Sequence, residues 1–208
     1  MRRYKDSIYE DQNNDDFDCS RVARRKNGAR KKSPCKRNLP QSKKKEVIFM
    51  RIAHPFAPVY DENSKILILG SFPSVRSRAD NFYYGHPQNR FWKLIAKLYD
   101  APTPQTTEEK QAFLLNNGIA LWDVIESCEI ENSSDQSIRD ATVNDLQQIF
   151  EKADIRAVFI NGKAAYRIYR KYHERDAFCL PSTSPANAAW TMKRLFDAWS
   201  IILNYTFR

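Results

Sequence analysis

Apolar residues recur along the chain in two patterns, which together predict an alternating series of strands and helices. Short uninterrupted apolar runs, as in residues 65–69, are typical of strands buried on both faces of a sheet. Apolar residues at helical spacing, as at Phe91, Leu94, Ile95 and Leu98, predict amphipathic helices between those runs. This alternation predicts an α/β domain with a mainly parallel central sheet and helices on both of its faces.

The same patterns give residue ranges for the expected elements. We expect strands at residues 65–69, 119–122, 157–160 and 177–180. We expect helices at residues 90–99, 108–116, 143–152, 162–172 and 188–203. The second helix has the clearest boundaries, because Thr106 and Glu109 have the spacing of a capping box and Asn117-Gly118 ends it. The polar residues 129–141 are expected to form a loop.

Parallel sheets covered by helices bind ligands beyond the carboxyl ends of their strands. The segments that follow the expected strands are residues 70–74, Asp123, residues 161–162 and residues 181–185. We expect these segments to line one crevice, which makes it the first candidate for a functional site.

Residues 1–46 have no hydrophobic period and predict a disordered basic tail, followed by a folded domain at residues 47–208. Of the 34 basic and 25 acidic residues, the tail holds 15 and 7, a net charge of +8, which leaves 19 and 18 for a nearly neutral domain. The tail could tether the protein to DNA, act as a nuclear-localisation patch, or be a solvated leader. The apolar pattern begins at Met50, which is an alternative start of translation.

Length and composition exclude several classes of protein. The 208 residues suit one well-buried domain, and no apolar run is long enough to span a bilayer. We expect an intracellular protein without a secretory signal, cytoplasmic with the nucleoid, or nuclear if the tail is real and the host is eukaryotic. The four cysteines lack CxxC spacing, so we expect no zinc, iron–sulfur cluster or other metal.

Common nucleotide-binding and hydrolase motifs are also missing. The chain has no G-x-x-x-x-G-K-[ST], and residues 70–74 do not begin a G-x-G-x-x-G string, so we expect no cofactor. Residues 70–74 do not match a G-x-S-x-G nucleophile elbow either. A small-ester hydrolase would have to use His86 as its base, and this class is kept as an alternative.

Two neighbouring strings carry a family resemblance. Residues 70–74 read GSFPS after the first strand, and residues 82–92 read FYYGHPQNRFW. The second string strongly resembles the uracil-DNA glycosylase superfamily. Within that superfamily it is most similar to the DNA-deoxyinosine (hypoxanthine-DNA) glycosylases, whose chains also have a stretch like residues 54–60. The resemblance covers about residues 52–204 and leaves the tail outside.

The resemblance implies roles for residues at the base. Asn89 stands where the deoxyinosine branch has a catalytic amide that positions the attacking water. Tyr84 matches the aromatic residue that stacks on the extruded base. Phe72 replaces the water-positioning Asn of mismatch-specific relatives, and we group it with Tyr84 and Asn161 as base-binding residues.

The resemblance also suggests where the DNA backbone would be bound. Apart from the resemblance, Arg76 and Arg78 follow the first strand and could contact phosphates beside the extruded nucleotide. Ser182 stands where other branches have a catalytic His, and Ala186 where they insert a bulky wedge, so neither of those two roles is assigned. The residues expected at DNA are Ser74, Arg76, Arg78, Ser182 and Ser184.

Each of these assignments has a structural alternative. Asn89 could cap the helix that follows it, and Ser182 and Ser184 could cap the last helix. Tyr84 and Phe72 could be core or wall aromatics.

The remaining positions are equally open. Residues 161–162 could form an ordinary strand-to-helix turn, His86-Pro87 could shape a helix entry, and the two arginines could lie on a solvated surface. Asp123, at the end of the second strand, has no assigned role.

The sequence therefore predicts a monofunctional DNA glycosylase that excises a deaminated base, hypoxanthine first and uracil second, by base flipping and water attack. No lysine matches a catalytic position, so strand cleavage through a Schiff base is not expected. The expected partner is damaged DNA, double- or single-stranded, and we expect a monomer without membrane association. The alternatives are a uracil- or mismatch-specific glycosylase and a non-catalytic binder of damaged DNA.

Overall fold

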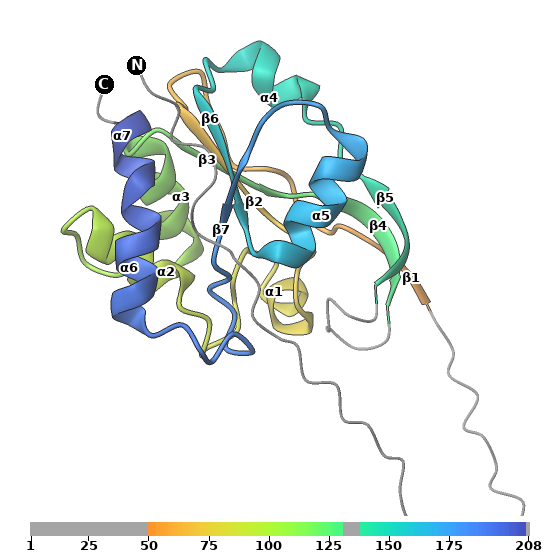
Figure 1. Ribbon diagram of the computed structural model, residues 1–208, viewed down its shortest axis with the longest axis horizontal. Coiled ribbons are helices and arrows are strands. Elements are labelled where there is room, and N and C mark those ends of the chain that lie inside the picture. The colour runs from red at the N-terminus through yellow and green to blue at the C-terminus, as the bar shows by residue number, and fades with distance from the viewer. Residues whose placement is uncertain (1–49, 131–137, 207–208) are drawn as a thin grey trace, which may run out of the picture. The chain divides into compact units, whose positions relative to one another are not determined.

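The computed structural model describes residues 50–130 and 138–206, so the predicted tail at residues 1–46 lies outside the described residues (Figure 1). The strands are β1 (Met50–Ala53), β2 (Ile66–Gly70), β3 (Ile119–Asp123), β4 (Ile125–Ile130), β5 (Arg139–Val143), β6 (Ala157–Asn161) and β7 (Phe178–Leu180). The helices are α1 (Val75–Ala79), α2 (Phe91–Leu98), α3 (Thr107–Asn116), α4 (Gln147–Lys152), α5 (Lys163–Tyr172), α6 (Met192–Trp199), the 3₁₀ helix η2 (Ser200–Ile202) and α7 (Leu203–Thr206). Within these ranges no helix is long and apolar enough to cross a membrane.

A four-stranded parallel sheet, in the order β3-β2-β6-β7, forms the centre of the fold. Every residue of β2, β3 and β6 is buried, as expected for parallel strands covered on both faces. In Figure 1, α2, α3 and α6 lie on one side of this sheet and α5 lies on the other. The predicted α/β class with a mainly parallel central sheet is therefore confirmed.

The strand register brings the carboxyl ends of the parallel strands to one edge. Gly70 at the end of β2 pairs with Asp123 at the end of β3. On the other side of β2, Asn161 at the end of β6 pairs with Leu180 at the end of β7. The polar residues of the predicted crevice thus leave the sheet at neighbouring positions.

A second, antiparallel sheet in the order β1-β4-β5 was not predicted. Residues 129–141 were expected to form a loop, but this was wrong in part, because β4 extends to Ile130 and β5 begins at Arg139. Residues 131–137 lie outside the described residues. The strand β4 forms by pairing with β1, which is far away in sequence, and such non-local pairing leaves only a weak trace in the local pattern.

Two helix starts also differ from the expected ones. Val143 was expected to begin a helix, but it ends β5 opposite Ile125, and α4 begins only at Gln147 after a turn in which Asp145 Oδ1 accepts from the Gln147 N–H (2.9 Å). The last helix begins at residue 192, not 188, because Thr191 Oγ1 accepts from Arg194 N and caps it there. Thr191, not Ser182 or Ser184, is therefore the cap of the last helix.

Candidate active site

A cleft of about 730 Å³ opens at the carboxyl edge of the parallel sheet. Residues from all of the expected strand-end segments contribute to it, together with part of the segment between α1 and α2. The predicted site residues that line the cleft are Phe72, Ser74, Tyr84, Asn89, Asn161, Ser182 and Ser184. Arg76 and Arg78 lie outside its lining.

Asn89 has a fixed orientation in this cleft. Its side-chain oxygen accepts two hydrogen bonds, from the Phe91 N–H at 3.0 Å and from Thr183 Oγ1 at 3.0 Å. A backbone N–H can only donate, so the atom facing it must be Oδ1 and not Nδ2. Asn89 thus contacts the start of α2, as the capping alternative supposed, and it also lines the cleft with its amide nitrogen uncommitted among the described residues.

Asn161 is at the centre of a buried hydrogen-bond network. Its Nδ2 donates to Tyr84 Oη at 3.0 Å and to Thr183 Oγ1 at 2.9 Å, and its Oδ1 accepts from the Thr183 N–H at 3.0 Å. Thr183 is fully buried, so these bonds satisfy groups that water does not reach. Both N–H groups of the Asn161 amide are therefore used within the protein.

The two candidate base-stacking rings are held differently. The Tyr84 ring stacks on Phe91, with centroids 4.0 Å apart and planes at 23°, and its backbone has a φ of +53°. Phe72 forms part of the cleft wall, where the His54 ring meets it edge-on at 6.1 Å and the Arg78 guanidinium lies 5.9 Å from its centroid. Both rings border the cleft, and Tyr84 is the more firmly fixed of the two.

His54 and Asp123 form a buried pair at the cleft. His54 Nε2 lies 2.9 Å from Asp123 Oδ2, and the two side chains are only 4% and 6% exposed. His54 Nδ1 lies 2.8 Å from the carbonyl oxygen of Phe56, and because that oxygen can only accept, Nδ1 carries a proton. Burial raises the pKa of neighbouring Tyr83, and the negative charge of Asp123 raises it further.

The absence of a side chain at Gly70 leaves room for the carboxylate of Asp123. A methyl group placed on Gly70 would lie 2.2 Å from Asp123 Oδ1 and 3.1 Å from Tyr84 Oη. Any residue larger than glycine would therefore have to displace the carboxylate. The glycine that ends β2 brings Asp123 and Tyr84 close to the same point of the cleft floor.

Arg90 fixes the loop that closes the far wall of the cleft. Its guanidinium donates to the carbonyl oxygens of Thr183, Ser184, Asn187 and Trp190, and its backbone N–H also donates to Thr183 O. This arginine follows Asn89 directly, so one short segment orients both the amide and the opposite loop.

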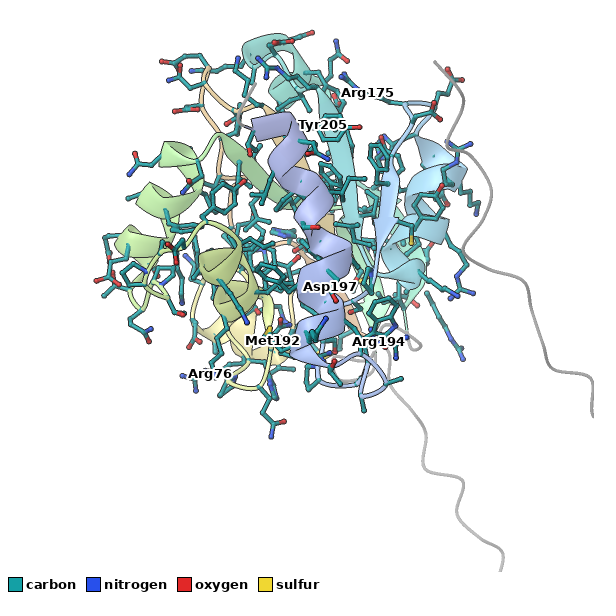
Figure 2. The ribbon with its side chains drawn as sticks, turned by 60° about the vertical axis from the view of Figure 1, so that its left-hand side comes forward. Arg76, Arg175, Met192, Arg194, Asp197 and Tyr205 are labelled. Atoms are coloured by element: carbon teal, nitrogen blue, oxygen red, sulfur yellow. The ribbon has the colours of Figure 1, made fainter. Side chains whose placement is uncertain are left out.

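The basic residues near the cleft differ in what they contact. Arg76 lies at the periphery, as Figure 2 shows, with Nε 2.9 Å from Asp80 Oδ2 on the next turn. Arg78 Nη1 donates to the Pro73 carbonyl oxygen at 2.8 Å and so holds the loop after β2. Arg167 on α5 is exposed and lines the cleft, and no acidic side chain in the described part of the chain pairs with it.

Sequence reasoning missed several of these residues. His54 meets Asp123 across 69 positions, and Arg90 reaches the far wall across 93 to 100 positions, separations at which no local pattern predicts a contact. Asp123 was expected at the crevice as an acidic residue at the end of a buried strand, and only its role was left unassigned. Arg167 had no usable signal, because one more cation on an exposed helix face is ordinary. In residues 50–130 and 138–206, no group of three or more His, Cys, Asp or Glu side chains is placed to hold a metal ion.

The fold and the cleft agree with the predicted family. The chain belongs to the uracil DNA glycosylase superfamily, whose family model matches residues 57–203. It is 35% identical over 158 residues to a hypoxanthine DNA glycosylase of Methanosarcina acetivorans, an alignment that covers 74% of this chain and 99% of the relative. It is 36% identical over 110 residues to a hypoxanthine DNA glycosylase of Methanosarcina barkeri, covering 52% of this chain and 70% of the relative.

A solved structure shares the fold as well. The solution NMR structure of a candidate uracil DNA glycosylase from Methanosarcina acetivorans superposes with a TM-score of 0.64 at 32% identity. The match covers 76% of this chain and all of the other. The two chains therefore share the same fold.

Proposed function

We propose that this protein is a DNA glycosylase that hydrolyses the N-glycosidic bond of deoxyinosine and leaves an abasic site. The two relatives named above are called hypoxanthine DNA glycosylases, and one of them aligns over nearly its full length. The observation that carries the proposal is the cleft in which the Tyr84 ring and the Asn89 amide donor face the same space. We propose that the partner is damaged DNA and that the protein is an intracellular monomer. In this proposal residues 47–208 form the glycosylase domain, and the basic tail binds DNA.

The cleft has the size and lining that an extruded nucleotide requires. Its volume of about 730 Å³ lies within the range of roughly 300–1,000 Å³ that is usual for small-molecule sites. Extruding a base costs a few kcal/mol, and the cost is lower for a mispaired base such as hypoxanthine. Stacking on an aromatic ring returns about 1–3 kcal/mol, and Tyr84, fixed by Phe91 and Asn161, is the ring we assign to it.

The orientation of Asn89 assigns it to the departing base. Breaking the C1′–N9 bond leaves the electron pair, and so a growing negative charge, on the purine. The Nδ2 group of Asn89 can donate hydrogen bonds to that charge, while its oxygen is occupied by Phe91 and Thr183. Asn89 is therefore catalytic in this proposal, but as a donor to the leaving group and not as the acceptor that positions water.

We propose that most of the remaining predicted residues contact the DNA. Ser74, Ser182 and Ser184 border the cleft, and the Ser74 hydroxyl also caps α1. We add Arg167 as a phosphate ligand and keep Arg76, which can exchange Asp80 for a phosphate. Arg78 is assigned to holding the loop, because its guanidinium is bonded to Pro73 O.

The full-length chain should be incubated with duplexes that carry one deoxyinosine or one deoxyuridine, and alkali-labile abasic sites counted. We expect release from deoxyinosine and an intact strand before alkali, because no lysine is found among the described cleft residues. Asn89→Ala should slow release about 10²- to 10³-fold, as is typical for loss of one donor to a developing anion. Asn63→Ala, an exposed amide outside the cleft, is the matched control.

The outcomes separate the alternatives. Faster release from deoxyuridine would favour the uracil-specific reading. Release that Asn89→Ala leaves unchanged would reduce Asn89 to a contact at the start of α2. Binding without release from either duplex would indicate a non-catalytic binder of damaged DNA.

A further inference from the structure

We propose that Asp123 is a second catalytic residue, which accepts a proton from the attacking water, and that His54 is the residue that positions it. The inference rests on the proposed glycosylase function. It names a residue that accepts a proton from the attacking water, a role for which no residue has been proposed so far. Hydrolysis needs an acceptor that orients water toward C1′, and the geometry of the cleft points to the Oδ1 atom of Asp123.

Asn89 cannot supply that acceptor. A carbonyl oxygen has two lone pairs, and the donors Phe91 N–H and Thr183 Oγ1 already occupy both on Asn89 Oδ1. Accepting a bond from water would require breaking one of them. The amide faces the cleft with its nitrogen, which only donates.

Two backbone carbonyl oxygens at the end of β2 each accept one hydrogen bond from the protein. The carbonyl oxygen of Gly70 accepts from the Val124 N–H at 2.9 Å, and that of Ser71 accepts from the Ile125 N–H at 3.1 Å. These bonds tie the end of β2 to the start of β4. A backbone carbonyl oxygen can orient a water molecule but is too weak a base to take its proton, so that step needs a side chain.

Asp123 has an acceptor of the right kind. It is the one acidic residue among the described residues that line the cleft. Its Oδ2 is bonded to His54, whereas no group in the described ranges donates to Oδ1. Oδ1 lies beside the Cα of Gly70, at the point that Tyr84 Oη also approaches. A negative charge there also stabilises the oxocarbenium-like sugar that forms as the base leaves.

His54 holds this carboxylate in one orientation. The imidazole bridges Asp123 Oδ2 and the Phe56 carbonyl oxygen, at 2.9 and 2.8 Å. Aromatic rings pack around it, with centroids 4.6 Å away for Phe56 and 6.0 Å for Tyr83. Since a buried carboxylate is unfavourable without a hydrogen-bonded partner, His54 accounts for why Asp123 can be buried at the cleft at all.

The proposed reaction cleaves the C1′–N9 bond and adds one water molecule. The C1′–N9 bond breaks and its electron pair leaves with hypoxanthine, whose charge Asn89 meets by donating. The water oxygen forms the C1′–O bond and its proton passes to Asp123 Oδ1, which leaves a 1′-hydroxyl on the abasic sugar. The proton then moves to solvent, and the hypoxanthine anion takes one up from solvent, so the net reaction is addition of one water molecule.

Reciprocal substitutions test the two roles. In single-turnover assays of the full-length chain on a deoxyinosine duplex, Asp123→Asn should slow hypoxanthine release about 10²- to 10⁴-fold, the usual worth of a general base. Affinity for the same duplex, measured by anisotropy, should stay within a few-fold. Asn89→Asp keeps the oxygen contacts and removes the Nδ2 donor, so it should also slow release. If Asn89 were instead the acceptor that positions water, Asn89→Asp would preserve release. Asp140→Asn removes an exposed carboxylate outside the cleft and is the matched control.

Two further variants separate positioning from folding. His54→Ala should slow release in the wild-type background but add nothing to Asp123→Asn, and His54→Gln, which can still donate to Oδ2, should recover part of the loss. Gly70→Ala pushes on Oδ1 without changing the carboxylate, so it should slow release at least tenfold, and it carries the test if Asp123→Asn does not fold.

The results distinguish this inference from the proposed function. A wild-type chain that releases no hypoxanthine would overturn the glycosylase proposal itself. A wild-type chain that releases hypoxanthine, with folded Asp123→Asn or Gly70→Ala within threefold of its rate, would overturn the role of Asp123 alone. Equal effects of His54→Ala in both backgrounds would reduce His54 to a structural residue.

Discussion

At the residue scale, the cleft is organised by short polar side chains that bond to one another across the strand ends. Asn161 links Tyr84 to Thr183, and Thr183 in turn donates to Asn89. Tyr84, the proposed stacking ring, and Asn89, the proposed donor to the leaving group, are thus members of one network. A change in one member is expected to alter the others, because buried hydrogen-bonded groups do not add independently.

The network makes Asn161→Ala a test of stability as much as of activity. The substitution leaves the buried N–H of Thr183 without its acceptor, and the Thr183 hydroxyl keeps only its bond to Asn89. An unsatisfied buried polar group costs about 1–3 kcal/mol, so the free energy of unfolding should fall by that amount in urea titrations. Asn63→Ala, at an exposed position, should change it by less than about 0.5 kcal/mol. Equal stabilities for the two variants would contradict the network.

Sequence reasoning at this scale found positions and missed contacts. Asn161 was recognised from its place at a strand end, and the cleft does include it. Its partners lie 22 and 77 positions away, so nothing local indicated that both N–H groups of its amide are used within the protein. Asp123 was found in the same way and left without a role, because its bond to His54 spans 69 positions.

At the element scale, the far wall of the cleft depends on the loop between β7 and α6. Arg90 bonds to carbonyl oxygens along this loop, and the ring of Trp190 near its end is covered by the Arg194 guanidinium at 4.7 Å. Figure 2 shows Arg194 beside Met192 at the start of α6. The loop carries Ser182 and Ser184, so its order decides where these two proposed DNA contacts lie.

Arg90→Lys is expected to loosen this loop although the charge is kept. A lysine ammonium is a point donor and cannot reproduce the planar fork that reaches several carbonyl oxygens at once. Amide hydrogen exchange over residues 183–190 should become faster, and hypoxanthine release should slow. Arg156→Lys, at a surface position outside the cleft, is the control. Unchanged exchange in the loop would show that Arg90 does not hold it.

The capping box of α3 was predicted correctly from the sequence, and its contribution to stability can be tested by mutation. Thr106 Oγ1 accepts from the Glu109 N–H, and the Glu109 carboxylate accepts from the Thr106 N–H, as the spacing predicted. Thr106→Ala should lower the free energy of unfolding by about 1 kcal/mol, measured by urea denaturation, and leave the rate of base release unchanged. A loss of release at full stability would connect α3 to the site, contrary to its position.

Glu109 gives the same helix a dependence on pH. Backbone hydrogen bonds from Gln105 and Thr106 lower the pKa of its carboxyl group, so the group binds its proton more weakly in the folded state. The stabilisation is present above the unfolded pKa and is lost as pH falls through the folded pKa. Glu109→Gln should therefore be less stable than the wild type at neutral pH, and thermal melts should show the gap closing under acid conditions. A gap independent of pH would contradict the ionic contact.

Elements differ in how far the sequence predicts them. The helix α3 and the buried strands β2, β3 and β6 have local signals, a capping box and apolar runs, and these elements were predicted closely. The strands β1, β4 and β5 form by pairing with one another, and their residues alternate too weakly to indicate it. The antiparallel sheet is therefore the part of the fold that the sequence did not predict.

At the scale of the whole molecule, the folded part of the chain has little net charge, so DNA binding by this part depends on where its cations lie. Arg167 is exposed at the cleft, without an acidic partner in the described ranges. Among the described residues that line the cleft, Arg167 is the one arginine, and no lysine is present. We expect Arg167 to contact one phosphate.

Arg167→Ala should weaken binding of any duplex, damaged or not, by a similar factor. Removing one phosphate contact should reduce the slope of log affinity against log salt by about 1. Arg170→Ala is the matched control, because Arg170 lies on the same helix outside the cleft and pairs with Asp176. An unchanged salt slope for Arg167→Ala would place the DNA elsewhere on the surface.

The central claim is that the cleft releases hypoxanthine from DNA, and mass spectrometry of the released base tests it most directly. The full-length chain in excess over a duplex with one deoxyinosine should liberate free hypoxanthine in the same amount as abasic sites, with the DNA strand intact. A matched duplex with deoxyadenosine should give neither product. Absence of free hypoxanthine at full duplex binding, or strand cleavage without base release, would contradict the account.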